Sequence, residues 1–283
     1  MKGKLVYSSS AISKLLDMPY TEEPNSLEIM ASARNGIFIG NSGKMNVPVF
    51  IDFNSLFNPH VFIAGMTGSG KTFLMKSLLM RLSFIMGASV IIVDFTGEYQ
   101  EAASLIGADF HNCIDKSGSI DISRSSYFIF KNLKESEKVS LASEILKSVA
   151  AKMRSNIGKN NNTFVLLDES WKLMNNNEDL EIIVREGRKY GVGLLLASQL
   201  LEDMSDSIVS NSASIFIFRI QIKKSAEKVM TNYNLGQEYA EAMQGLEQGK
   251  CLMIKLDKNN KRSITIIRRV SGISISPKTK LLL

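Results

Sequence analysis

Six unbroken apolar runs constrain the fold of this 283-residue chain more than any other feature of its sequence. A strand that is apolar on both faces is typical of a parallel sheet covered by helices on both sides. The runs occupy residues 61–64, 90–93, 127–130, 164–167, 194–197 and 215–218. Helical stretches lie between or after them, at residues 72–86, 136–154, 180–189 and 226–233. This alternation predicts a doubly wound α/β fold with a mostly parallel sheet and a ligand at the carboxyl ends of its strands.

Shorter segments flank this core. Residues 37–40 and 47–53 read as a short N-terminal β-hairpin, because the stretch between them has the composition of a hairpin turn. Residues 250–255 and 263–269 read as a final hairpin, and a short helix is expected at 11–18. We therefore expect an N-terminal lead-in at 1–57, a core domain at 58–269 and a C-terminal tail at 270–283.

A glycine-rich segment between the first buried run and the first helix fits the pattern GxxxxGK[ST] at every position. Glycines let successive backbone N–H groups face one centre, and the start of the helix adds a positive dipole end, so the segment predicts a phosphate-binding loop. The Lys71 ammonium would reach the β- and γ-phosphates of ATP, and the Thr72 hydroxyl would ligate Mg²⁺. The expected nucleotide-binding residues are Gly65, Thr67, Gly68, Ser69, Gly70, Lys71, Thr72 and Phe73.

Two carboxylates follow the buried run at 164–167. Asp168 would hold Mg²⁺ through water, and Glu169 would orient and deprotonate the water that attacks the γ-phosphate. A helix-capping acid explains one carboxylate at a strand end but not two beside a phosphate loop. The pair therefore favours ATP hydrolysis over phosphoryl transfer to another substrate.

Other polar residues lie where the strands are expected to end. Gln199 follows the run at 194–197 and would touch the γ-phosphate or the lytic water, unless it is only a polar strand terminus. Arg188 and Arg219 are the candidates for stabilising charge on the transferred phosphate, against the alternative of surface ion pairs. Asp94 and the segment to Tyr99 either couple to the loop or form a structural turn.

The composition excludes some classes of site. The formal charge of +6 permits an anionic partner without requiring one. Cys113 and Cys251 are far apart, and His60 and His111 are the only histidines, which argues against a metal cluster or a disulfide framework. Trp171 and the methionines of the first helix, Met75, Met80 and Met86, are expected in the core. No apolar stretch approaches a membrane span, so a cytoplasmic protein, at most peripheral at a membrane complex, is expected.

Taken together, these segments resemble the HerA–FtsK superfamily of RecA-like ring motors, and within it the VirB/TraC-type conjugation and type IV secretion ATPases. The sequence 167–171, Leu-Asp-Glu-Ser-Trp, resembles the Asp-Glu-Ala-Trp box of that family, with Ser170 at the Ala position. The further resembling segments are 18–20, 38–41, 47–49, 185–191, 197–199 with Asp203 and Asn211, and 249–251.

The resemblance implies a RecA-like ATPase domain at 58–269 that works as a homo-hexamer, with ATP at subunit interfaces and arginines donated in trans. It also implies force on DNA, through backbone contacts, or on a secreted substrate, together with partner proteins in a membrane complex. The chain departs from the family pattern in having only 57 residues before the core, where such ATPases carry a larger N-terminal half or a barrel.

Three alternatives remain beside a motor for DNA transfer or type IV secretion. The first is a translocase for DNA repair or viral genome packaging. The second, of another class, is a nucleotide-binding assembly platform with little turnover, against which the Asp168–Glu169 pair argues. The third is a small-molecule kinase, which would need an acceptor-substrate lid that the sequence does not show.

Overall fold

The computed structural model describes residues 36–42, 47–53, 59–112, 120–130, 132–154, 162–174, 177–199, 205–220, 223–256 and 262–270. The expected helix at 11–18, the turn residues 43–44, Cys113, Asp203 and the tail at 271–283 lie outside these ranges. The chain forms two compact units, of which one contains residues 1–71 and 198–270 and the other contains residues 72–197 and 271–283. The domain boundaries expected from the sequence remain a prediction.

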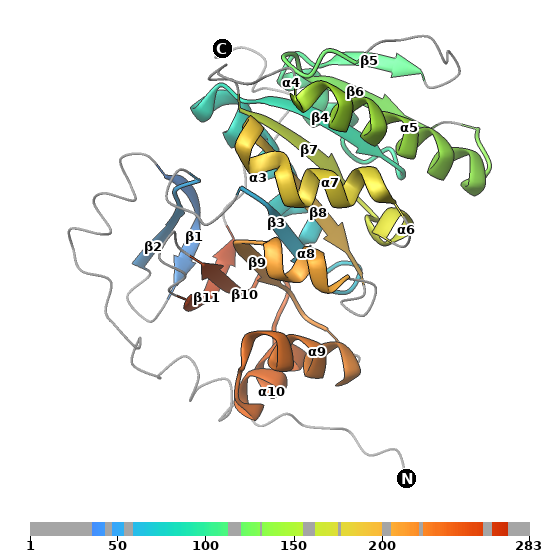
Figure 1. Ribbon diagram of the computed structural model, residues 1–283. Coiled ribbons are helices and arrows are strands. Elements are labelled where there is room, and N and C mark those ends of the chain that lie inside the picture. Colours follow the sequence, from blue (N-terminus) through green and yellow to red (C-terminus); the bar gives the residue numbers. More distant parts are fainter. Residues whose placement is uncertain are drawn as a thin grey trace. The chain divides into compact units, whose positions relative to one another are not determined.

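The second unit contains five strands that pair only in parallel (Figure 1). Its strands are β4 (Ser89–Asp94), β5 (Asp109–Asn112), β6 (Ser126–Ile129), β7 (Thr163–Leu167) and β8 (Val192–Ser198). They lie in the order β8-β7-β4-β6-β5, and every neighbouring pair is parallel. All residues of β7 and β8 are buried, as their unbroken apolar sequences predict.

The helices of this unit are α3 (Lys71–Met86), α4 (Gln100–Leu105), α5 (Glu135–Met153), α6 (Trp171–Met174) and α7 (Glu178–Glu186). Helix α5 begins where the Lys134 N–H donates to the Glu137 carboxylate at 2.8 Å. Helix α7 begins after Asn177, whose side-chain oxygen accepts from the Leu180 N–H at 2.9 Å. The expected helix at 180–189 instead ends at Glu186 and continues as a 3₁₀ turn over Gly187–Tyr190.

The first unit combines parallel and antiparallel pairing. Its strands are β1 (Ile37–Ser42), β2 (Val47–Ile51), β3 (Val61–Ala64), β9 (Ser214–Ile217), β10 (Cys251–Leu256) and β11 (Arg262–Val270), in the order β2-β1-β11-β10-β9-β3. Strands β3 and β9 are parallel, whereas the other pairs are antiparallel. Its helices are α8 (Asp206–Asn211), α9 (Lys223–Tyr233) and α10 (Gln237–Gly245).

The two hairpins expected at the ends of the core meet in this unit, because β1 pairs with β11. Pro48 lies in β2, the last strand in the order, where a residue without an N–H is tolerated. The strands and helices confirm the predicted α/β fold with a mostly parallel sheet and a short N-terminal hairpin.

Candidate nucleotide-binding site

The phosphate loop connects β3 to α3 without a further element. Gly65, Gly68 and Gly70 have φ values of 150°, 75° and 119°, in the region that side chains other than glycine rarely adopt. These three glycines turn the backbone so that the helix begins at Lys71. The first N–H groups of an α-helix have no acceptor within the helix, so the start of α3 is a place where phosphate oxygens bind well.

Two neighbouring segments of the first unit crowd Gly65 and Gly70 of this loop. A Cβ atom at Gly65 would lie 2.6 Å from the Cβ of Phe218. A Cβ atom at Gly70 would lie 3.0 Å from a ring carbon of the same phenylalanine. The Gly249 N–H donates to the Ser69 carbonyl at 2.9 Å, which ties the turn before β10 to the loop. The loop is therefore braced from two sides by backbone and by one buried aromatic ring.

The Lys71 and Gln199 side chains both lie at this loop. The Lys71 ammonium donates to the carbonyls of Gly65 at 2.6 Å and Met66 at 3.2 Å, and the side chain is largely buried. The Thr67 hydroxyl donates to the Gln199 side-chain oxygen at 3.3 Å. Gln199 therefore lies beside the phosphate loop, as expected from its place after the strand.

The two candidate arginines have different surroundings. Arg219 follows β9, its carbonyl accepts from the Met66 N–H at 2.9 Å, and its Nε atom lies 3.2 Å from the Met66 sulfur. This arginine is therefore attached to the phosphate loop of its own chain. Arg188 is exposed on the 3₁₀ turn of the second unit.

The acidic pair lies directly after β7 in the second unit. Asp168 is buried, and this burial raises the pKa of its carboxyl to about 6, while a hydrogen bond from the Glu169 N–H partly opposes the shift. The Tyr99 hydroxyl is fully buried close to Asp168 without meeting hydrogen-bond geometry. Burial, followed by the negative charge of Asp168, raises the pKa of Tyr99 well above its usual value. A buried carboxylate of raised pKa is typical of a functional site.

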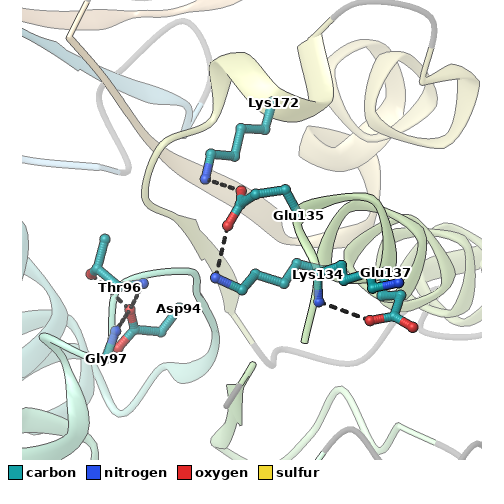
Figure 2. Close-up of polar contacts among 8 residues, drawn as sticks. Asp94, Thr96, Gly97, Lys134, Glu135, Glu137 and Lys172 are labelled. Carbon is teal, nitrogen blue, oxygen red and sulfur yellow. Dashed lines mark hydrogen bonds and ion pairs between the residues drawn. The ribbon is translucent and has the colours of Figure 1, made fainter. Parts of the chain in front are cut away.

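Asp94 is the centre of the loop after β4 (Figure 2). One oxygen of its carboxylate accepts from the Thr96 N–H, the Thr96 hydroxyl and the Gly97 N–H, at 2.9, 3.0 and 2.7 Å. The other oxygen accepts from the Tyr99 N–H and the Tyr127 hydroxyl, both at 2.9 Å. Of the two roles expected for this segment, these contacts favour the structural turn, and the Asp-x-Thr-Gly sequence is the signal for it.

The expectation that Trp171 belongs to the core is wrong. Its side chain is 41% exposed, because α6 buries Leu173 and Met174 instead. The methionines Met75 and Met80 are buried as expected, whereas Met86 at the end of α3 is only half-buried. Phe73, one of the expected nucleotide-binding residues, is exposed in the first turn of α3.

Sequence reasoning missed the cluster around Lys172. Its ammonium pairs with the Glu135 carboxylate at 2.6 Å and lies 5.0 Å from the centre of the Phe95 ring. Figure 2 shows this ion pair between α6 and the first residue of α5. Hydrogen bonds from Lys138 and Lys172 lower the pKa of Glu135 to about 2. The basic residue after the acidic box was visible in the sequence, but its partners on other elements were not.

The residues present fit a nucleotide with a divalent cation. The glycine cradle and the start of α3 suit phosphate oxygens, and the Thr72 hydroxyl and the Asp168 carboxylate are oxygen donors of the kind that Mg²⁺ prefers. Within the described ranges, no group of three or more His, Cys, Asp and Glu side chains converges as a metal site. Cys251 and His60 are buried, and His111 stacks on Phe128. In the same part of the chain, no helix is both long enough and apolar enough to cross a membrane.

The fold and the loop geometry define a P-loop nucleotide-binding protein of the ATPase class. The family model described as "Helicase HerA, central domain" matches residues 37–272, and the chain belongs to this family. The recognition of a HerA–FtsK-type ATPase from sequence motifs is thereby confirmed.

Two curated relatives match part of the chain. The DNA double-strand break repair helicase HerA of Sulfurisphaera tokodaii is 25% identical over 175 residues, which cover 58% of this chain and 34% of the relative. The protein of the same description from Sulfolobus acidocaldarius is 33% identical over 73 residues, which cover 25% of this chain and 15% of the relative. The matched region thus spans about a third or less of each relative.

Solved structures share the fold at low sequence identity. VirB4 of Thermoanaerobacter pseudethanolicus superimposes with a TM-score of 0.66 at 15% identity, covering 87% of this chain and 98% of VirB4. The genome packaging NTPase B204 of Sulfolobus turreted icosahedral virus 2, in complex with AMPPCP, gives 0.57 at 16% identity and covers 77% of this chain and 100% of B204. The cytoplasmic domain of the type VII secretion ATPase EccC from Thermomonospora curvata gives 0.56 at 14% identity, covering 84% of this chain and 26% of EccC.

Proposed function

We propose that this chain is the motor domain of an ATP-hydrolysing ring that moves DNA. The observation that carries the proposal is a complete phosphate loop, with three positive-φ glycines leading into α3, in a chain whose buried β7 is followed directly by Asp168 and Glu169. Membership in the HerA family supports an NTPase, and the double-strand break repair described for the matched relatives supports DNA as the substrate.

The loop backbone and three side chains have separate parts in the proposed nucleotide binding. The N–H groups of the loop and of the first turn of α3 hold phosphate oxygens, and Lys71 contributes a positive charge to the β- and γ-phosphates. The Thr72 hydroxyl, and the Asp168 carboxylate through water, would hold Mg²⁺, which would supply positive charge to the phosphate oxygens.

Glu169 and Gln199 act on the attacking water. The Glu169 carboxylate accepts a proton from this water and orients it toward the γ-phosphorus. The Gln199 amide, which already contacts Thr67 of the loop, changes partner when the γ-phosphate leaves and so reports hydrolysis to its strand. The proposed step needs no other base from the chain.

In a homo-hexamer, an arginine of a neighbouring subunit would supply further positive charge to the transferred phosphate. Arg188 is exposed and is our candidate for donation in trans, where an arginine stabilises charge on the transferred phosphate strongly. Arg219 contacts Met66 of its own loop, so we assign it to the nucleotide of its own chain. Contacts with DNA would go to the phosphate backbone and weaken with salt, as the charge of +6 allows.

ATP turnover by the purified chain, measured across protein concentration with and without double-stranded DNA, tests the proposal. We expect turnover per subunit to rise with concentration, because a trans arginine needs a neighbour, and to rise again with DNA. Glu169→Gln should bind ATP with unchanged affinity and lose turnover by about a thousandfold, since an amide cannot accept the proton.

The controls separate the parts of the proposal. Lys71→Ala should weaken ATP binding by at least about a hundredfold, and unchanged affinity would refute the assignment of the phosphate loop. Turnover that ignores DNA would favour a substrate other than DNA, such as a secreted protein. ATP binding without turnover at any concentration would favour an assembly platform instead.

A further inference from the structure

Trp171 is a large aromatic side chain that the packing of its helix does not require. It begins α6, whose buried residues are Leu173 and Met174, while its own side chain is 41% exposed. Its indole N–H donates to the Glu169 carboxylate at 2.5 Å. The only tryptophan of the chain is therefore hydrogen-bonded to the residue that the proposed function needs as the base.

Glu169 and Trp171 are only two residues apart, and an unusual backbone conformation at Glu169 accompanies the contact between their side chains. Its φ is 52°, a left-handed value that few residues other than glycine adopt. The Glu169 N–H donates to the Asp168 carboxylate at 2.9 Å, which holds the backbone in this turn. Strained backbone of this kind persists only where the surroundings enforce it, and it gathers at functional sites.

The neighbouring Lys172 also lies near the indole ring. The Lys172 ammonium lies 5.7 Å from the centre of the Trp171 ring and 5.0 Å from that of Phe95, whose side chain is buried. The same ammonium pairs with Glu135 at the start of α5. Figure 2 shows how Lys172 reaches Glu135 from α6. Lys172, the residue after Trp171 in α6, is thus itself held by Glu135 of α5 and lies over the Phe95 ring.

We infer that Trp171 is a positioning residue that fixes the rotation of the Glu169 carboxylate for its work on the attacking water. A charge-assisted hydrogen bond is short and directional, and a general base acts only within hydrogen-bond reach of the proton it takes. The inference rests on the proposed hydrolysis, because it assigns to Trp171 the orientation of the base of that same reaction.

The contact can be tested without turnover, since a single tryptophan gives a single indole signal in a ¹H–¹⁵N NMR spectrum. Replacing Glu169 by Ala should shift the indole proton upfield, because it loses a charged acceptor. The matched control is Glu144→Ala, an exposed glutamate in the middle of α5, which should leave the signal in place. An indole signal that does not move in Glu169→Ala would overturn the inference.

The kinetic test uses Trp171→Phe, which keeps an aromatic ring for Lys172 and removes the N–H donor. We expect kcat to fall about tenfold and KM for ATP to stay within about twofold, because the phosphate loop binds the nucleotide. The double variant Trp171→Phe/Glu169→Gln should turn over no more slowly than Glu169→Gln alone.

The outcomes distinguish this inference from the proposed function. Turnover in the unaltered chain with an unchanged kcat in Trp171→Phe would overturn the inference alone. A further loss in the double variant, beyond that of Glu169→Gln, would show that Trp171 supports the fold rather than Glu169 and would also overturn it. Absence of turnover in the unaltered chain would refute the proposed function, and the assigned role of Trp171 with it.

Discussion

The phosphate loop and the end of β7 bear the residues expected to act on one nucleotide, but the chain holds them by different means. The loop is shaped by backbone: three glycines have positive φ, and the Ser69 carbonyl accepts from the Gly249 N–H. The ends of β7 and of its neighbour β4 are held by side chains: the Trp171 indole donates to Glu169 after β7, and the Asp94 carboxylate at the end of β4 accepts five hydrogen bonds. Backbone bracing tolerates changes in neighbouring side chains, whereas a side-chain network fails when one member is lost.

Removal of Asp94 should show this difference with the largest effect. In Asp94→Ala, three backbone N–H groups and the Tyr127 hydroxyl lose their acceptor inside the protein, which should lower the free energy of unfolding by about 4 kcal/mol. Urea denaturation measures the change. Asp109→Ala, which removes an exposed carboxylate paired with Arg124, should cost less than about 1 kcal/mol. Equal losses in both variants would contradict the network.

A methyl group at Gly65 should test the bracing of the loop. Gly65→Ala places a Cβ atom 2.6 Å from that of Phe218, so we expect a loss of about 3 kcal/mol and weakened ATP binding. Gly68→Ala is the matched control, because its Cβ atom meets nothing within 4 Å and only the φ of 75° is unfavourable. The control should cost about 1 kcal/mol. Calorimetric ATP titration and denaturation of both variants would show whether crowding or backbone strain matters more.

Asp168→Asn should stabilise the nucleotide-free protein, with a defined dependence on pH. Burial raises the pKa of Asp168 from 3.8 to about 6, so the folded protein binds the proton more tightly than the unfolded chain does. The destabilisation is absent below pH 3.8, grows as pH rises, and is complete above about pH 6. We expect Asp168→Asn to gain about 2 to 3 kcal/mol at pH 8 and progressively less as pH falls below 6. Denaturation curves at pH 5 and pH 8 measure this gain, and a gain that is the same at both values would exclude the mechanism.

Ser170→Ala should have the smallest effect. The Ser170 hydroxyl and the Ser170 N–H both donate to the Ala197 carbonyl at 2.8 Å, so the carbonyl keeps one donor when the hydroxyl is removed. We expect a loss below about 1 kcal/mol and unchanged ATP turnover. A much larger loss would mean that the hydroxyl has a second role near the acidic pair.

The fold was predictable where local chemistry is decisive. Residues 61–64 form β3 as expected, and the predicted helix at 136–154 corresponds to α5 within one residue at each end. The strand β5 was missed, because Asp-Phe-His-Asn has no apolar run and its pairing with β6 at the edge of the order supplies its stability. The helix α6 was also missed, since four residues are too few to show a period.

The residues of the candidate site were likewise predictable from the sequence only where local chemistry is decisive. The glycines, Lys71 and Thr72 of the loop were recognisable because phosphate binding needs those residue types at that spacing within one continuous segment. The acidic pair was recognisable because it ends a buried strand. Trp171 was wrongly predicted to lie in the core, because tryptophan is usually buried. In the structure its side chain is exposed and donates to the Glu169 carboxylate.

The sequence by itself determined the alternation of the buried strands with the longer helices, the phosphate loop and the resemblance to the HerA family, because each can be recognised within short continuous segments. Only the tertiary structure decided that Arg219 lies on the loop of its own chain, that Phe218 and Gly249 brace the loop, and that Lys172 pairs with Glu135. The physical reason is that a hydrogen bond or a van der Waals contact requires two groups within about 4 Å, and sequence spacing predicts such a distance only within one helix, strand or turn.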